Sequence, residues 1–173
     1  MNKIFVCYLF TCFDHHENIK KFIEHYKKYN SGIEHSLLIC LKMLKKKDVL
    51  LIKNYLKNIN YIEFIDPIET NDYDFGSYKR VCMLYPNKQI LFLNSHSYPI
   101  CDNWLSKLAE NSDENSLIGT SASNESLLNS VILKKKYKIF SYILKKIYYK
   151  KIFNPFPNPH IRTSSFLVNS NIF

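Results

Sequence analysis

Glycine is scarce in this sequence: only Gly32, Gly76 and Gly119 occur among its 173 residues. The phosphate-binding loops of Walker-type nucleotidases and of dinucleotide-binding domains each need several glycines close together, because the backbone must approach the phosphate. The three glycines of this chain are isolated from one another. Both kinds of phosphate loop are therefore excluded.

Paired cysteines and long apolar runs are also missing. The five cysteines show no C-x-x-C spacing and lie mostly among apolar residues, which predicts reduced, buried thiols of a cytosolic protein and neither a disulfide framework nor a zinc site. The apolar start of the chain, residues 1–10, is too short for a membrane span and lacks a small-residue cleavage site. We expect a strand there and not a signal peptide.

Positive charge is what the chain has in excess, with a net charge of +9. Such an excess suits anionic partners, among them nucleotide diphosphates, anionic lipids and nucleic acid. A genome rich in A and T, which favours Lys, Asn and Ile, would explain the same excess. With 46% hydrophobic residues, a chain of this length is expected to form one globular domain over residues 1–173.

Segments of strand and helix pattern alternate through the first part of the chain. Apolar runs predict strands at residues 4–10, 36–41 and 61–65, and amphipathic spacing predicts helices at 19–29 and 48–58. The charge run 42–47 is expected to be a solvated connection. This alternation is typical of a parallel sheet with crossover helices.

The stretch 72–108 continues the pattern as loop, helix, buried strand, polar turn and helix. The apolar run 90–93 predicts a strand buried on both faces, and it stops abruptly at the polar residues 94–97. Polar residues just past the carboxyl end of a central strand lie where α/β sheets bind ligands. We expect the functional site at this turn.

Three motifs of this part of the chain carry a resemblance to a known family. The first is Asp74-Phe-Gly-Ser-Tyr-Lys79 before a helix, and the second is Leu93-Asn-Ser-His-Ser-Tyr-Pro99 at a strand end. The third is the segment 154–166, in which a Pro-rich loop leads into Arg162-Thr163. In this order they resemble bacterial glycosyltransferases of the GT-A fold, closest to the rhamnan synthesis protein F group of polysaccharide enzymes. The resemblance implies an α/β, Rossmann-like three-layer sandwich with a mostly parallel sheet. Similar enzymes continue past the Arg-Thr strand, so we expect a C-terminally truncated version of that fold.

The resemblance also implies an activity, namely transfer of a sugar from a nucleotide-diphosphate donor to a polysaccharide or lipid-linked glycan acceptor. It places the protein in the cytoplasm, peripheral at the inner face of the membrane. A non-catalytic remnant that binds a nucleotide sugar or a partner protein is the first alternative. A basic module that binds nucleic acid is the second and ranks last, because aromatic-basic RNA motifs are missing.

The metal site of most GT-A enzymes is an Asp-x-Asp at the end of the central strand, and here Asn94-Ser95-His96 takes its place. The resemblance implies that these three residues contact the donor and that Asn94 and His96 hold a manganese or magnesium ion. Histidine suits manganese better than magnesium. A metal-free site, in which His96 donates to phosphate, and a turn without a chemical role remain open.

Further nucleotide-sugar contacts are expected from residues that flank the strands. Asp72 and Asp74 would bond ribose or sugar hydroxyls, Gly76 would permit close approach of the backbone, and Lys79 would reach phosphate. Asp14, after the first strand, would contact the nucleotide. The alternatives are that Asp14 and Asp74 each cap a helix.

The last motif supplies the remaining expected site residues. Arg162 and Thr163 would bind phosphate at the start of a strand over 162–168, and His160 would be the general base. Alternatively, Arg162 holds the Pro-rich loop by bonding its carbonyl groups.

The stretch 131–151 combines lysines with an apolar stripe of Phe140, Ile143, Leu144 and Ile147. It would either lie against an anionic membrane surface, near a lipid-linked acceptor, or pack on the sheet with its lysines in water.

Overall fold

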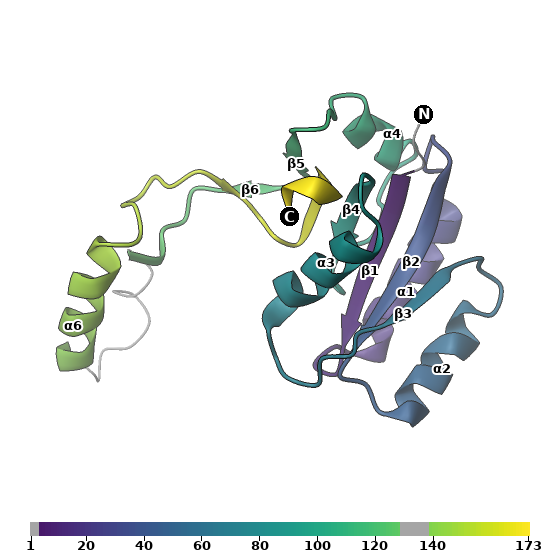
Figure 1. Cartoon of the computed structure of the whole chain (residues 1–173), viewed down its shortest axis with the longest axis horizontal. Coiled ribbons are helices and arrows are strands. Elements are labelled where there is room, and N and C mark those ends of the chain that lie inside the picture. The colour runs from purple at the N-terminus through teal and green to yellow at the C-terminus, as the bar shows by residue number, and fades with distance from the viewer. Residues whose placement is uncertain (1–3, 129–138) are drawn as a thin grey trace. The chain divides into compact units, whose positions relative to one another are not determined.

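The chain divides into two units in the computed structural model, which describes residues 4–128 and 139–173. The first unit comprises Met1–Thr120 and Thr163–Phe173, and the second comprises Ser121–Arg162. The sheet and most of the helices belong to the first unit (Figure 1). A single domain over residues 1–173 stays a prediction.

The first unit contains a six-stranded sheet in the order β3-β2-β1-β4-β8-β5. Its strands are β1 (Ile4–Thr11), β2 (His35–Lys42), β3 (Ile62–Ile65), β4 (Gln89–Leu93), β5 (Leu117–Gly119) and β8 (Ser165–Asn169). The first four are parallel, and β8 pairs antiparallel with both β4 and β5. The predicted α/β fold with a mostly parallel sheet is confirmed.

Helices cover both faces of this sheet. They are α1 (His16–Lys28), α2 (Lys46–Leu56), α3 (Tyr73–Leu84) and α4 (Trp104–Ala109), and the 3-10 turn η1 (Ser170–Ile172) follows β8. In α1 the apolar residues recur at three- and four-residue steps, so one stripe of the helix faces the sheet. Ile19, Phe22 and Ile23 of that stripe are buried.

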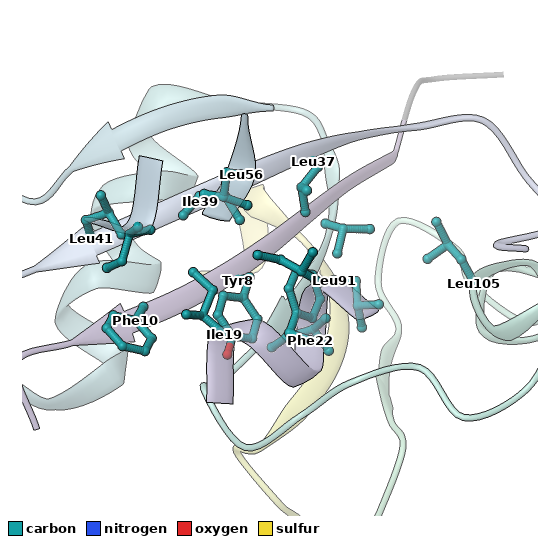
Figure 2. Close-up of a cluster of buried hydrophobic side chains, with 14 of the residues drawn as sticks. Tyr8, Phe10, Ile19, Phe22, Leu37, Ile39, Leu41, Leu56, Leu91 and Leu105 are labelled. Atoms are coloured by element: carbon teal, nitrogen blue, oxygen red, sulfur yellow. The ribbon is translucent and has the colours of Figure 1, made fainter. Parts of the chain in front are cut away.

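A core cluster of buried hydrophobic residues lies between one face of the sheet and the helices α1, α2 and α4. Strand residues two apart point to the same face, so Val6, Tyr8 and Phe10 of β1 all enter this cluster. The Tyr8 ring stacks on Phe22 of α1 with 4.0 Å between ring centroids (Figure 2). The core therefore fixes β1 at the centre of the sheet.

An aromatic cluster covers the other face. Tyr78 of α3 lies over Phe92 of β4 with ring centroids 4.3 Å apart, and Phe166 of β8 and the C-terminal Phe173 complete the group. These contacts hold α3 against β4 and β8. The start of α3 is thereby fixed near the carboxyl ends of the parallel strands.

Several predicted boundaries were wrong in detail. The last strand begins at Ser165 rather than at Arg162, because residues 163–164 form a turn that precedes it. Lys42, the first residue of the charge run predicted to be solvated, is the last residue of β2 and is 2% exposed. Lys45, Lys46 and Lys47 are exposed, as expected.

The second unit contains a two-stranded pairing and one described helix. The short strands β6 (Ala122–Ser123) and β7 (His160–Ile161) pair antiparallel, and α6 spans Ile139–Lys150. Residues 131–138 of the predicted amphipathic stretch lie outside the described residues. Among the helices of residues 4–128 and 139–173, none has the length and apolar character needed to cross a membrane.

Candidate functional site

The order of the strands marks one edge of the sheet as the place for a site. The chain builds β1, β2 and β3 outward in one direction and then crosses back to place β4 on the other side of β1. Ligands of open α/β sheets bind outside the carboxyl ends of the strands where the strand order reverses in this way. The residues that follow β1 and β4 therefore form the candidate site.

A cavity of about 250 Å³ lies at this edge. The segments after β1, β2 and β4 and the start of α3 line it, with Asp14, Lys42, Asp74, Asn94, Ser95 and His96 among the polar side chains. Phe13 and Tyr73 also line it and are 66% and 76% exposed. Five of the residues expected from the sequence are brought together here, namely Asp14, Asp74, Asn94, Ser95 and His96.

Asp14 joins the loops after β1 and β4. One carboxylate oxygen accepts hydrogen bonds from the Thr11 backbone N–H at 2.7 Å and the Thr11 hydroxyl at 2.9 Å, and the other accepts from Ser95 Oγ at 2.5 Å. The buried Tyr8 hydroxyl donates to the Ser95 carbonyl at 2.9 Å. Asp14 does not cap α1, whose N-cap residue is His15, so the helix-cap alternative was wrong.

Asn94 shapes the turn after β4. Its side-chain oxygen accepts hydrogen bonds from the His96 backbone N–H at 3.2 Å and from Ser97 Oγ at 3.0 Å. His96 is exposed, and its Nδ1 lies 3.4 Å from the amide nitrogen Nδ2 of Asn18. The amide N–H donates to Nδ1, so a neutral His96 ring carries its proton on Nε2 and can donate a hydrogen bond.

Lys42 lines the cavity and forms one end of an ion-pair network. Its ammonium group bonds the Asp72 carboxylate and donates to the Tyr73 carbonyl at 2.8 Å. Arg80 of α3 donates to Asp72 at 2.7 Å and to Asp66 at 2.6 Å. Two cations and two carboxylates thus tie the ends of β2 and β3 to the start of α3.

The environment keeps both carboxylates of this network ionised. Hydrogen bonds from Arg80 and from Lys42 hold the pKa of Asp72 well below its usual range. Burial raises the pKa of Asp66, but its hydrogen bonds from Arg80, from Ser77 Oγ at 2.5 Å and from the Ile68 backbone N–H outweigh burial and lower it. The charges of the network are therefore balanced internally.

Gly76 leaves room for this arrangement. A Cβ atom at Gly76 would lie 1.9 Å from a carboxylate oxygen of Asp72. The glycine expected to let the backbone approach a ligand instead lets the Asp72 carboxylate fold back over α3. The Asp72 oxygens bond Lys42 and Arg80, so this carboxylate is used within the protein.

Asp74 is the second carboxylate that lines the cavity, besides Asp14. It lies within the first turn of α3, whose N-cap residue is Asp72, so the prediction that Asp74 caps this helix was wrong. Its side chain makes no hydrogen bond or ion pair within the described part of the chain. Burial and the charge of Asp14 raise its pKa, while Lys42 and His96 act in the opposite direction.

The other expected site residues are not among those that line this cavity. Lys79 is exposed on α3 and does not line it. His160 and Arg162 belong to the second unit, where Arg162 Nη2 lies 3.8 Å from Glu125. His160 Nδ1 donates to the Asn158 carbonyl at 2.8 Å, which leaves Nε2 of a neutral ring able to accept a proton. Thr163 belongs to the first unit and precedes β8.

Sequence reasoning missed Lys42, Phe13 and Tyr73. Lys42 is the first residue of the charge run 42–47, and its side chain was predicted to be exposed with the others. One signal pointed the other way, since Lys42 directly follows six residues without a charge, residues 36–41. Phe13 and Tyr73 carried no signal, because exposed aromatic residues in loops show no periodicity.

No protein-family profile and no curated protein matches this sequence. Solved structures do match. Two crystal structures of the glycosyltransferase GlyE from Streptococcus pneumoniae TIGR4, one of them the apo-form, share 13% identity with the chain at a TM-score of 0.51 and cover 97% and 99% of it. The mannosyltransferase Ktr4p from S. cerevisiae shares 12% identity at a TM-score of 0.50 and covers 98% of the chain.

These similarities support the GT-A type of the fold. The chain spans 34% and 35% of the two GlyE chains and 56% of the Ktr4p chain. At such identities the likeness concerns the fold and not the chemistry. It supports a glycosyltransferase fold. Membership of the rhamnan synthesis protein F group is not tested by it and stays a prediction.

The side-chain atoms at the turn after β4 that could ligate a metal fit a divalent ion poorly. The Asn94 oxygen already accepts two hydrogen bonds, and Ser95 Oγ is bound to Asp14. Among the described residues, no three His, Cys, Asp or Glu side chains gather into a group that could hold a metal. Hard cations prefer several oxygen ligands. A manganese or magnesium ion on Asn94 and His96 therefore stays a prediction, and no step below depends on it.

The network predicts a definite order of stability losses. Asp72→Asn leaves the 2% exposed Lys42 without a carboxylate and should lower the free energy of unfolding by about 3 kcal/mol, the lower end for breaking a buried pair, because Asp72 is itself 35% exposed. Lys42→Met leaves Asp72 paired with Arg80 and should cost less. Urea unfolding of both variants tests this order, and a larger loss for Lys42→Met would contradict it.

The lowered pKa of Asp72 predicts how this difference depends on pH. A carboxylate with a depressed pKa stabilises the folded state above its ordinary value, 3.8, and that contribution disappears as the pH falls below it. The stability gap between wild type and Asp72→Asn should therefore be full at pH 7 and should narrow below about pH 4. Unfolding curves at several pH values measure it; a gap that stays constant into acid would show that the Asp72 charge is unimportant.

Proposed function

We propose that this chain binds a nucleotide-diphosphate sugar in the cavity at the β1 and β4 ends and transfers the sugar to a polysaccharide or lipid-linked glycan. The observation that carries the proposal is the position of the cavity, at the point where the strand order of a GT-A type sheet reverses. Its contents agree with that use. Exposed aromatic side chains line it, and so does the Asp74 carboxylate, which has no partner among the described residues.

Each part of the donor has a matching group in this proposal. The exposed rings of Phe13 and Tyr73 offer flat apolar faces for the base. The Asp74 carboxylate accepts hydrogen bonds from ribose or sugar hydroxyls. His96 Nε2–H donates to a phosphate oxygen. Asp72, considered for a sugar contact from the sequence, is already bound to Lys42 and Arg80 and acts by holding the start of α3.

Transfer then needs a group that takes the proton of the acceptor hydroxyl. The acceptor oxygen forms a bond to the anomeric carbon of the sugar, the bond from that carbon to the phosphate oxygen breaks, and the nucleoside diphosphate leaves with the bonding electrons. His160 is the proposed base, since its Nε2 can accept a proton while Nδ1 donates to Asn158. Arg162, Thr163 and Lys79 are proposed to assist at the phosphates through charge and hydrogen bonds.

A thermal-shift measurement tests donor binding. UDP, GDP, CDP and dTDP are added to the purified chain, each with and without manganese. A ligand that binds only the folded state raises the melting temperature, by an amount equivalent to about 2.7 kcal/mol at a hundred times its Kd. We expect one nucleotide to raise the melting temperature, and the manganese arms test the metal. If no nucleotide shifts a folded sample, the proposal fails.

Asp74→Asn tests the assignment within the cavity. Loss of a charged hydrogen-bond acceptor should weaken binding of the nucleotide sugar by roughly tenfold or more. Glu69→Gln is the matched control, because it neutralises an exposed carboxylate in the loop that leads to α3 and should leave affinity unchanged. Equal affinities of the two variants would remove Asp74 from the site.

Asn94→Ala and Arg162→Ala test two contacts taken from the sequence motifs. Asn94→Ala removes the acceptor that shapes the turn after β4, and Arg162→Ala removes the guanidinium of a side chain that is 51% exposed. Both changes should weaken nucleotide binding, measured by titration calorimetry. Unchanged affinity in both variants would sink these assignments. Binding without turnover of any nucleotide sugar would favour the alternative of a non-catalytic binding protein.

A further inference from the structure

The positive charge of the chain is concentrated in the second unit. Residues 121–162 contain nine of the 24 basic residues but only Glu125 of the 15 acidic ones, so their net charge is +8. The rest of the chain has a net charge of +1. A composition bias from the genome would account for lysine, which occurs in both units, but not for the near absence of acidic residues from the second unit. The second unit therefore has its own reason to be basic.

The helix α6 of this unit has two different faces. At about 100° per residue, Ile143, Leu144, Ile147 and Tyr148 lie on one side of the helix, and Lys145, Lys146 and Lys150 lie on the other. Leu144 is 70% exposed, Ile147 55% and Ile143 52%. Ile152, just after the helix, is exposed as well. Large aliphatic side chains that are this exposed form an apolar surface, and such surfaces are typical of binding sites for a protein or a membrane.

The combination of the two faces selects the kind of partner. Nucleic acid would use the lysines but would gain nothing from exposed leucine and isoleucine. A protein groove would use the apolar side but would not require a helix whose charged residues are all lysine, from Ile139 to Lys150. An anionic bilayer surface uses both, because the apolar face enters the boundary between headgroups and acyl chains while lysines reach lipid phosphates.

We propose that α6 lies on the surface of a membrane that contains anionic lipid. Ile143, Leu144 and Ile147 would face the acyl boundary, and Lys145, Lys146 and Lys150 would contact the phosphates. The inference rests on the second unit alone and does not depend on the proposed function. For a chain that glycosylates a lipid-linked acceptor, it would place the enzyme at the surface where that acceptor lies.

Co-sedimentation of the full chain with vesicles tests the proposal. One vesicle preparation is phosphatidylcholine, and the other contains equal parts phosphatidylcholine and phosphatidylglycerol. We expect binding to the anionic vesicles only, weakening as salt is added because exposed charges are screened. Lys145→Gln, Lys146→Gln and Lys150→Gln together should weaken it on the order of a hundredfold, since each lysine near an anionic surface contributes about a fivefold factor.

A matched control comes from the first unit. Lys45, Lys46 and Lys47 are three consecutive exposed lysines, and changing all three to Gln removes the same amount of charge as the α6 triple variant. This variant should bind the anionic vesicles within about threefold of wild type, because only long-range attraction is lost. Equal losses in the two triple variants would mean that binding follows net charge, and the assignment to α6 would be overturned.

The apolar face is tested separately. Leu144→Gln with Ile147→Gln keeps every charge and should weaken vesicle binding at least tenfold, since two buried aliphatic side chains are lost from the interface. Binding that is unaffected by this change would overturn the proposal in favour of a polyanion site. If wild type binds neither vesicle, the proposal is wrong, and a lower melting temperature of this variant would then indicate that the apolar face packs inside the protein.

Discussion

The ammonium group of Lys42 is the constraint on which the site depends. A charge that is withdrawn from water must be matched within the protein, or the folded state loses several kcal/mol. Here the match is Asp72, and Asp72 is shared with Arg80, which also holds Asp66. Lys42 ends β2, Asp66 follows β3, and Asp72 directly precedes α3, which contains Arg80. The network therefore determines where α3 begins. Tyr73 and Asp74 take their places at the cavity as a result.

The two aspartates of the Asp72-Tyr-Asp74 segment show how environment divides identical groups. Asp72 bonds two cations, so its pKa falls and its oxygens are occupied. Asp74, two residues later, lies half-buried near Asp14, and its pKa rises while it has no partner among the described residues. The first therefore stabilises the protein, and the second is available to a ligand. Gly76 makes the division feasible, since only a glycine leaves space for the Asp72 carboxylate.

The sequence allowed the fold to be predicted because the apolar runs of β1, β2 and β4 are long and the alternation with helices is regular. It also placed Asn94, Ser95 and His96 at a strand end, since a buried run that stops at polar residues is a local signal. The role of Lys42 was not predictable, because its partner is 30 residues away. The same holds for Asp14, which bonds Ser95 across 81 residues of chain. Such contacts depend on strand order, which no local pattern contains.

The chemistry of the cavity also bears on how a diphosphate could be held there. The positive charge of Lys42 is already matched by Asp72, and the carboxylates of Asp14 and Asp74 add negative charge to the walls. A diphosphate would meet His96 as its main donor from the described walls, so further positive charge must come with the ligand or from another part of the protein. Few cations line this cavity. Whether it can bind a complete donor therefore depends on how the diphosphate is held, more than on how the sugar is held.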